Sequence, residues 1–146
     1  MIGSLAFANG RFATTGDAQG RTYILRGATT DATARVLTTD GNSAVSIFNG
    51  VRLDSDTVIT FDGVITAMQN GAQAYAGWRV EGLIVNDGGT TTLANSATTV
   101  IQNASNWGMA LGADNSNNIL TVTVTGEASH NIRWVANLRT VEVTYA

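Results

Sequence analysis

The stretch GEASHNIRWVANLRTVEV, which runs from Gly126 to Val143, holds the only histidine of the chain and two of its eight arginines. From Ile132 onward, apolar residues occupy every second position. This period of two is typical of a β-strand that buries one face, because successive side chains point to opposite sides of a sheet. We therefore interpret the stretch as a central strand and not as a chemical site. Its predicted buried face consists of Ile132, Trp134, Ala136 and Leu138.

The apolar phase changes near the end of this strand, where Val141, Val143 and Tyr145 occupy the odd positions. One extra residue near Arg139 and Thr140, forming a β-bulge, would bring these side chains onto the buried face. Alternatively, the strand changes its partner sheet at this point. Both readings predict that Val141, Val143 and Tyr145 continue the apolar face.

Elsewhere, runs rich in Val, Ile, Thr and aromatic residues alternate with Asn-Gly and Asp-Gly pairs. Such runs suit strands and such pairs suit tight turns. The spacing predicts an all-β chain, a single-domain antiparallel β-sandwich of jelly-roll type with almost no helix. We expect residues 16–146 to form the sandwich and residues 1–15, for which no partner strand is evident, to act as an inter-subunit arm or an anchor. The predicted core comprises Trp78, Val80, Ile84, Leu120, Val122, Val124, Ile132, Trp134 and Leu138.

Asp62 and Gly63 resemble the turn of a short hairpin within TVITFDGVITAM. However, the apolar residues on both sides of this pair keep one phase straight through it. We therefore predict one strand over Thr57–Gln69, a turn over Asn70–Ala74 and a second strand over Tyr75–Val85, with Gly63 as a bend or bulge. The residues that keep the phase are Ile59, Phe61, Ile65 and Ala67.

Composition excludes several classes of protein. The chain has no cysteine, proline or lysine, and its net charge of −3 is scattered along the sequence. These features argue against disulfides, thiolate chemistry, nucleic-acid binding and a basic membrane patch. The N-terminus lacks the charged region of a signal peptide, and no run approaches the roughly 20 apolar residues of a membrane span. We expect synthesis in a cytoplasm without a secretion signal.

Two groups of polar residues are candidates for chemistry. His130 lies beside Ser129 and close to Glu127, but no nucleophile-elbow motif accompanies them, so a turn is the favoured reading. The second group is Asp54, Asp56 and Asp62, which lack the pattern of a calcium loop, so a solvated turn is favoured there too. We therefore expect no catalytic residue, no cofactor and no metal, and a chain that is not an enzyme.

Charged residues alternate with apolar ones in two of the predicted strands. Arg79 and Glu81 alternate with Trp78 and Val80, and Arg133 precedes Trp134 in the same way. This pattern predicts cross-strand ion pairs on the exposed face of a sheet, each contributing less than about 1 kcal/mol. The arginines of the last strand are expected to reach toward a neighbouring strand or subunit.

Five segments of the chain form a recognisable set. They are GDAQ (Gly16–Gln19), YILRGATTDAT (Tyr23–Thr33), TDG (Thr39–Gly41), GWRVEGLI (Gly77–Ile84) and LTVTVTGEASHNIRWVA (Leu120–Ala136). Together they resemble a β-rich module of virion surface proteins in tailed bacteriophages, and the resemblance covers roughly Gly16 to Val143. No catalytic residue is carried over from this module.

The resemblance implies a structural protein on the virion surface. Because the module begins almost at Met1, a capsid decoration (cement) protein on the capsid exterior is favoured, bound as a homotrimer to the major capsid protein or other virion proteins. The alternative is a tail-fibre or spike head that binds a host receptor or glycan. A depolymerase ranks third, because no carboxylate pair stands out. The candidate interface residues are Leu5, Phe7, Phe12, Trp107, Met109, Arg133 and Arg139.

Overall fold

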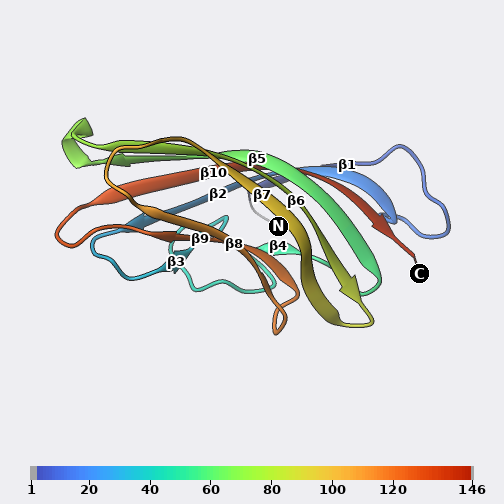
Figure 1. Cartoon of the computed structure of the whole chain (residues 1–146). Helices are drawn as coiled ribbons and strands as arrows, with labels where there is room; N and C mark the ends of the chain where they lie inside the picture. Colours follow the sequence, from blue (N-terminus) through green and yellow to red (C-terminus); the bar gives the residue numbers. More distant parts are fainter. Residues whose placement is uncertain (1–2, 146) are drawn as a thin grey trace.

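The computed structural model describes residues 3–145, which form two antiparallel β-sheets (Figure 1). The larger sheet has six strands in the order β1-β2-β10-β5-β6-β7. Its strands are β1 (Ser4–Phe7), β2 (Ala18–Thr29), β5 (Thr57–Gln69), β6 (Tyr75–Asp87), β7 (Thr90–Asn103) and β10 (Ile132–Thr144). The predicted last strand is thus flanked on both sides, by β2 and β5, as expected of a central strand.

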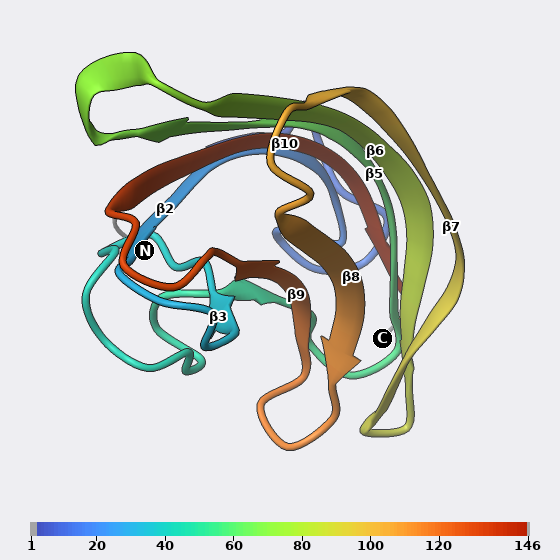
Figure 2. The same cartoon turned by 60° about the vertical axis from the view of Figure 1, so that its left-hand side comes forward.

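The smaller sheet is built around β9. Its strands are β3 (Arg35–Val36), β4 (Val51–Arg52), β8 (Gly108–Asp114) and β9 (Ile119–Thr125). β8 pairs with β9 along its whole length, so β3 and β4 must share the opposite edge of β9. Figure 2 shows the long strands of the larger sheet curving over this smaller sheet.

The core lies between the two sheets. Every residue predicted for the core is buried, which confirms the period-two reading of these strands. Three indole rings meet at its centre: Trp134 lies 5.8 Å from Trp78 and 5.7 Å from Trp107, measured between ring centroids. The Trp134 Nε1–H donates to the Thr29 hydroxyl at 3.0 Å, so the polar end of this buried ring has a partner.

The predicted hairpin is confirmed. β5 and β6 pair in one register, and the 3-10 helix η1 (Asn70–Ala72) forms part of their connection. Gly63 is not a bulge, because neither of its two ladders shifts there. A glycine is needed at this position because a Cβ atom would lie 2.1 Å from the carbonyl oxygen of Asn137 in β10.

The prediction that the apolar face continues to the end of the chain is wrong. β10 keeps one register with β2 and β5 throughout, so Val141, Val143 and Tyr145 point outward and are 67%, 47% and 90% exposed. Thr140 and Glu142 point inward instead and are only 3% and 4% exposed. The Thr140 hydroxyl donates to Glu142, and Gln19 on β2 also donates to the Glu142 carboxylate, so both inward side chains have partners and no bulge is required.

The N-terminal segment has a partner strand that the sequence did not reveal. β1 pairs with β2 and forms one edge of the larger sheet. The chain then passes through a loop that the carboxylate of Asp17 holds by accepting hydrogen bonds from the backbone N–H groups of Phe12, Ala13 and Thr14. Part of residues 1–15 therefore extends the sheet; Met1 and Ile2 lie outside the described residues.

The strand order confirms an all-β fold but not the jelly-roll connectivity. A jelly roll distributes eight strands over two sheets, whereas this chain places five long strands and the short β1 in one sheet and four short strands in the other. Across residues 3–145, no helix has the length and apolar character needed to cross a membrane.

Candidate binding surface

The side chains of the larger sheet that point away from the smaller sheet form what we call the outer face. Period-two alternation places these side chains on one surface, and many of them are apolar. The large aliphatic members on β2, β5, β6 and β10 are between 37% and 67% exposed, whereas such side chains are usually buried. They are Ile24, Val58, Val64, Leu83, Val135, Val141 and Val143.

A groove of about 930 Å³ crosses the outer face at right angles to the strands. Two rows of cross-strand neighbours line it, each with one residue from every strand of the sheet. The first row is Phe7, Gly20, Val141, Thr60, Leu83 and Asn95. The second row is Leu5, Thr22, Arg139, Asp62, Glu81 and Ala97. Strand register therefore brings the lining residues of the groove together.

The charged side chains of these two rows all lie in the second row. Arg139 Nη2 donates to Asp62 Oδ2 at 2.5 Å, which is a cross-strand ion pair between β10 and β5. Within residues 3–145, the residues from which such pairs were predicted, Arg79, Glu81 and Arg133, form none. Glu81 lies opposite Asp62 on the neighbouring strand, so two carboxylates and one guanidinium stand side by side. The Arg139 and Asp62 side chains are 72% and 49% exposed, so their attraction contributes at most about 1 kcal/mol to stability. These groups are accessible to a polar ligand.

The pairing of Asp62 with Glu81 is a feature that the sequence reading missed. The alternation pattern places the two residues in separate predicted strands and does not by itself show that they are neighbours. Their register follows from the hairpin that was predicted, because Thr57 pairs with Asn86 and every later pair keeps the same sum of residue numbers. The position of the turn therefore predicts that Asp62 and Glu81 are cross-strand neighbours. The contact of Asp62 with Arg139 is different, because β5 and β10 are far apart in the sequence.

The seven candidate interface residues lie in different parts of the structure. Leu5, Phe7 and Arg139 line the groove, and Leu5 and Phe7 are 73% and 75% exposed. Arg133 lies on the outer face opposite Met68, away from the groove. Phe12 is exposed in the N-terminal loop.

The two remaining candidates lie on the inner side of the molecule. Trp107 is only 3% exposed and packs against Trp134 within its own chain. Met109 is half-buried against the same core. Neither side chain contributes to the outer face.

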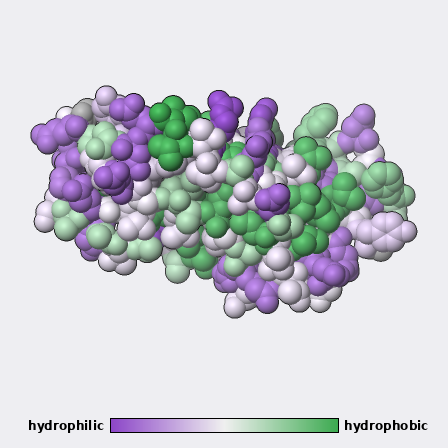
Figure 3. All heavy atoms as spheres, in the orientation of Figure 1, coloured by the Kyte–Doolittle hydropathy of each residue, from purple (hydrophilic) through white to green (hydrophobic). Residues whose placement is uncertain are grey.

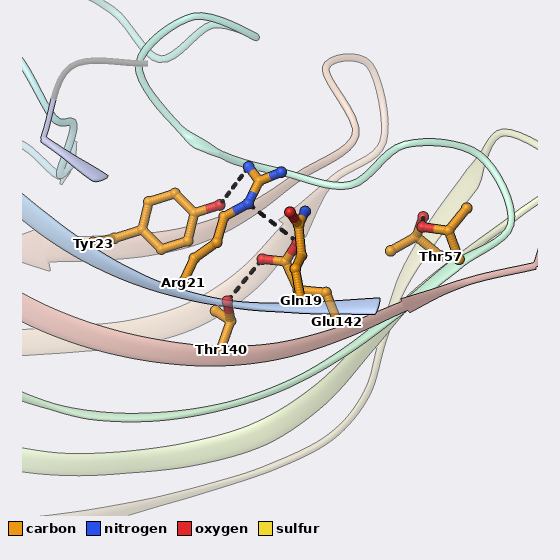
Figure 4. Close-up of polar contacts among 7 residues, drawn as sticks. Gln19, Arg21, Tyr23, Thr57, Thr140 and Glu142 are labelled. Atoms are coloured by element: carbon orange, nitrogen blue, oxygen red, sulfur yellow. Dashed lines mark hydrogen bonds and ion pairs between the residues drawn. The ribbon is translucent and has the colours of Figure 1, made fainter. Parts of the chain in front are cut away.

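A second polar cluster occupies the inner side of β2 and β10 (Figure 4). The carboxylate of Glu142 accepts hydrogen bonds from Thr140 at 2.7 Å and from Gln19 at 2.9 Å, and it lies 3.3 Å from Arg21 Nε. Arg21 also donates to the hydroxyl of Tyr23, whose pKa burial raises to about 12. The polar groups of the cluster pair with one another, so we assign it to stability.

The remaining candidate residues lie in turns. His130 Nδ1 lies 2.8 Å from the carbonyl oxygen of Ala128 and 3.8 Å from Glu127, and Ser129 has a positive φ of 63°. Asp54 forms an ion pair with Arg52. In the part of the chain that the structure describes, no three acidic, histidine or cysteine side chains come together as metal ligands.

Comparison with known proteins finds a weak structural similarity and no match in sequence. No protein-family model matches the sequence, and no curated protein matches it. One solved structure, the tailspike protein gp49 of Acinetobacter baumannii bacteriophage Fri1, is similar with a TM-score of 0.45 and 12% identity. The match covers 95% of this chain and 20% of the tailspike, so the chain spans about a fifth of that protein.

The tailspike corrects one prediction from the sequence. It is described as a capsular polysaccharide depolymerase, and therefore as an enzyme, whereas we predicted a chain that is not an enzyme. We no longer exclude enzymatic activity, although a likeness at this level transfers no substrate to the chain. The likeness agrees only coarsely with a phage virion module, and it does not distinguish a capsid decoration protein from a tail fibre.

Proposed function

We propose that this chain is a bacteriophage virion protein that binds the outer shell of the capsid through its outer face, as a homotrimer. The proposal rests on one observation, the large aliphatic side chains that are exposed on that face. Apolar groups gathered on one exposed surface mark interaction sites, because burying them against a partner removes them from water. The resemblance of the five sequence segments supports a place on the phage particle.

A protein partner suits this face better than a small ligand. β-Branched side chains such as Val135, Val141 and Val143 are stiff and stand on a regular sheet, so they offer an ordered surface that loses little entropy on binding. Val58 lies directly opposite Val143, which makes one continuous apolar contact. Binding of this kind would add stability to an assembled shell by mass action.

The groove supports a second candidate function. Its second row offers two carboxylates and a guanidinium, with the exposed ring of Phe7 at one end of the groove and Asn95 and Ser96 at the other. Several hydrogen-bonding groups along one groove suit an extended polar ligand such as a glycan on a host cell. Under this alternative the chain is the head of a tail fibre or spike.

Electron microscopy of the phage that encodes the chain tests the proposal directly. Labelled antibodies against the chain should decorate the icosahedral shell of the particle. Label confined to the tail tip would overturn the capsid proposal in favour of the glycan-binding head.

A variant then tests the face itself. Val141→Asp places a charge in the middle of the outer face, and we expect affinity for empty shells to fall by about tenfold or more. Thr30→Asp, at an exposed position outside that face, is the matched control and should bind like the parent chain. Equal binding by Val141→Asp and the parent would contradict the assignment of this face.

A further inference from the structure

One edge of the larger sheet is long and open. β7 pairs with β6 alone among the described residues, so no described strand pairs with its second edge, although the N–H groups of Thr91 and Ser96 donate to the side chains of Asn115 and Asn95. Proteins usually protect such an edge with charged residues or proline. The 14 residues of β7 contain neither. Val100 and Ile101 on this strand are 57% and 60% exposed, and Figure 3 shows hydrophobic residues gathered where β6, β7 and β8 lie.

Two β-bulges limit the part of this edge that is regular. The ladder with β6 shifts between Gly77 and Trp78 and again between Leu83 and Ile84, which leaves Ile101 and Ala94 as the extra residues of β7. Bulges twist an edge and interrupt its pairing. The segment 95–100 between them keeps one register with β6 and is long enough to pair with one short strand.

The opposite edge of the same sheet is a short strand. β1 has four residues, none of them charged, so its length fits between the two bulges of β7. Five antiparallel pairings separate β1 from β7, and the two strands therefore run in opposite directions. A second copy placed edge to edge would continue the antiparallel sheet with both outer faces on the same side.

The groove reaches both edges. Its first row ends at Phe7 on β1 and Asn95 on β7, and its second row ends at Leu5 and Ala97. If Leu5 of the next copy lies opposite Ala97, then Phe7 of that copy lies opposite Asn95. Both rows of the groove would then continue from one copy into the next. The same pairing would place the exposed side chains of Leu5 and Phe7 beside a neighbour instead of water.

We propose that β7 of one copy pairs with β1 of the next copy, so that the six-stranded sheets join into a ring with no free edge. The inference rests on the proposed self-assembly, but not on the capsid as the binding partner. It names head-to-tail contacts, in which each copy uses two different edges. An antiparallel contact of β7 with β7 would instead produce a closed dimer and would leave β1 uncovered.

Cysteine cross-linking tests this contact, because the chain has no cysteine of its own. The double variant Leu5→Cys with Ala97→Cys should form covalent multimers on mild oxidation, and the largest species should give the number of copies in the ring. Each single variant should remain a single chain on a denaturing gel. Covalent dimers from Ala97→Cys alone would show that β7 pairs with itself and would overturn the proposal.

Two control experiments test the register of the contact and the role of the β7 edge. Ala6→Cys with Ala97→Cys places the cysteines on opposite faces of the joined sheet and should not cross-link. Ala97→Lys adds a charge at the edge and should convert the assembly to monomers in light scattering, whereas Thr66→Lys on the outer face should not. A parent chain that is monomeric at micromolar concentration contradicts the edge pairing. Monomers that still bind shells would leave the outer-face function standing.

Discussion

At the scale of single residues, Gly63 shows how closely two strands approach each other. A Cβ atom at this position would lie 2.1 Å from the carbonyl oxygen of Asn137 and 2.7 Å from the Leu138 side chain. Both neighbours belong to β10, the central strand, and the backbone carbonyl has no room to move without breaking its ladder. The glycine therefore keeps β5 and β10 in contact where the groove crosses them.

We expect Gly63→Ala to lower the free energy of unfolding by about 2 kcal/mol or more, because the added methyl group overpacks a filled site. Gly77→Ala is the matched control, since its Cβ atom would meet nothing closer than the Ile65 carbonyl oxygen at 3.7 Å. Its stability should change by less than about 1 kcal/mol, with a gain favoured by reduced backbone entropy. Urea unfolding of both variants measures the difference, and equal stabilities would refute the close approach.

Glu142 is the residue on which the inner polar cluster depends. Its side chain is 5% exposed and it neutralises Arg21, whose side chain is 25% exposed. Glu142→Gln removes the charge and leaves the guanidinium without a counter-ion, so we expect a loss of about 1–3 kcal/mol. Asp62→Asn breaks the exposed ion pair with Arg139 and should cost less than about 1 kcal/mol. Denaturant midpoints that rank the two variants the other way would contradict the assignment.

At the scale of elements, the N-terminal loop depends on one carboxylate. Asp17 accepts from the backbone N–H groups of Ala13 at 2.6 Å, Thr14 at 2.8 Å and Phe12 at 3.0 Å. These hydrogen bonds favour the charged form and hold the pKa of Asp17 below its ordinary value, with the bond from Ala13 as the largest cause. They also bring the end of β1 back toward the start of β2.

Removing that carboxylate should release the loop. Asp17→Asn loses the charge and one acceptor oxygen, so we expect trypsin to cleave after the exposed Arg11 several times faster than in the parent chain. Asp31→Asn, which loses a carboxylate in a different exposed turn, is the matched control. Identical cleavage of the Asp17 variant and the control would show that the loop is held by other contacts.

The same carboxylate predicts a pH dependence. Because the folded pKa of Asp17 lies below the unfolded one, its contribution to stability is complete above the unfolded pKa of about 4 and is lost as the pH falls through the lowered folded pKa. The amide resonances of Ala13 and Thr14 should therefore titrate together, with a midpoint below the ordinary value for an aspartate. A midpoint at or above pH 4 in these NMR spectra would contradict the hydrogen-bonded geometry.

At the scale of the whole molecule, the proposed binding through the outer face predicts how the protein affects the stability of a phage particle. Many copies that each bury this face against the shell would add their stabilisation. Particles that lack the protein should therefore burst at a lower temperature or lower internal pressure, while their adsorption to cells stays unchanged. Measuring both on the same stripped particles separates the candidates. Robust particles that no longer adsorb would favour the glycan-binding head.

The sequence by itself determined the local features of this protein. Period two identified the strands and the core, and the apolar phase through Asp62-Gly63 placed the turn after Gln69. A hairpin register follows from the position of its turn, so the neighbourhood of Asp62 and Glu81 was also encoded locally. These features depend on residues that are close in the chain or on the alternation of one strand.

Only the tertiary structure decided the features that join distant strands. The sequence could not show that Glu142 faces inward, because its partners Gln19 and Arg21 lie on β2, more than 100 residues away. For the same reason it could not show that two rows of residues from six strands align into a groove. A one-residue slip between strands turns every side chain to the other face, and packing of the two sheets selects one register.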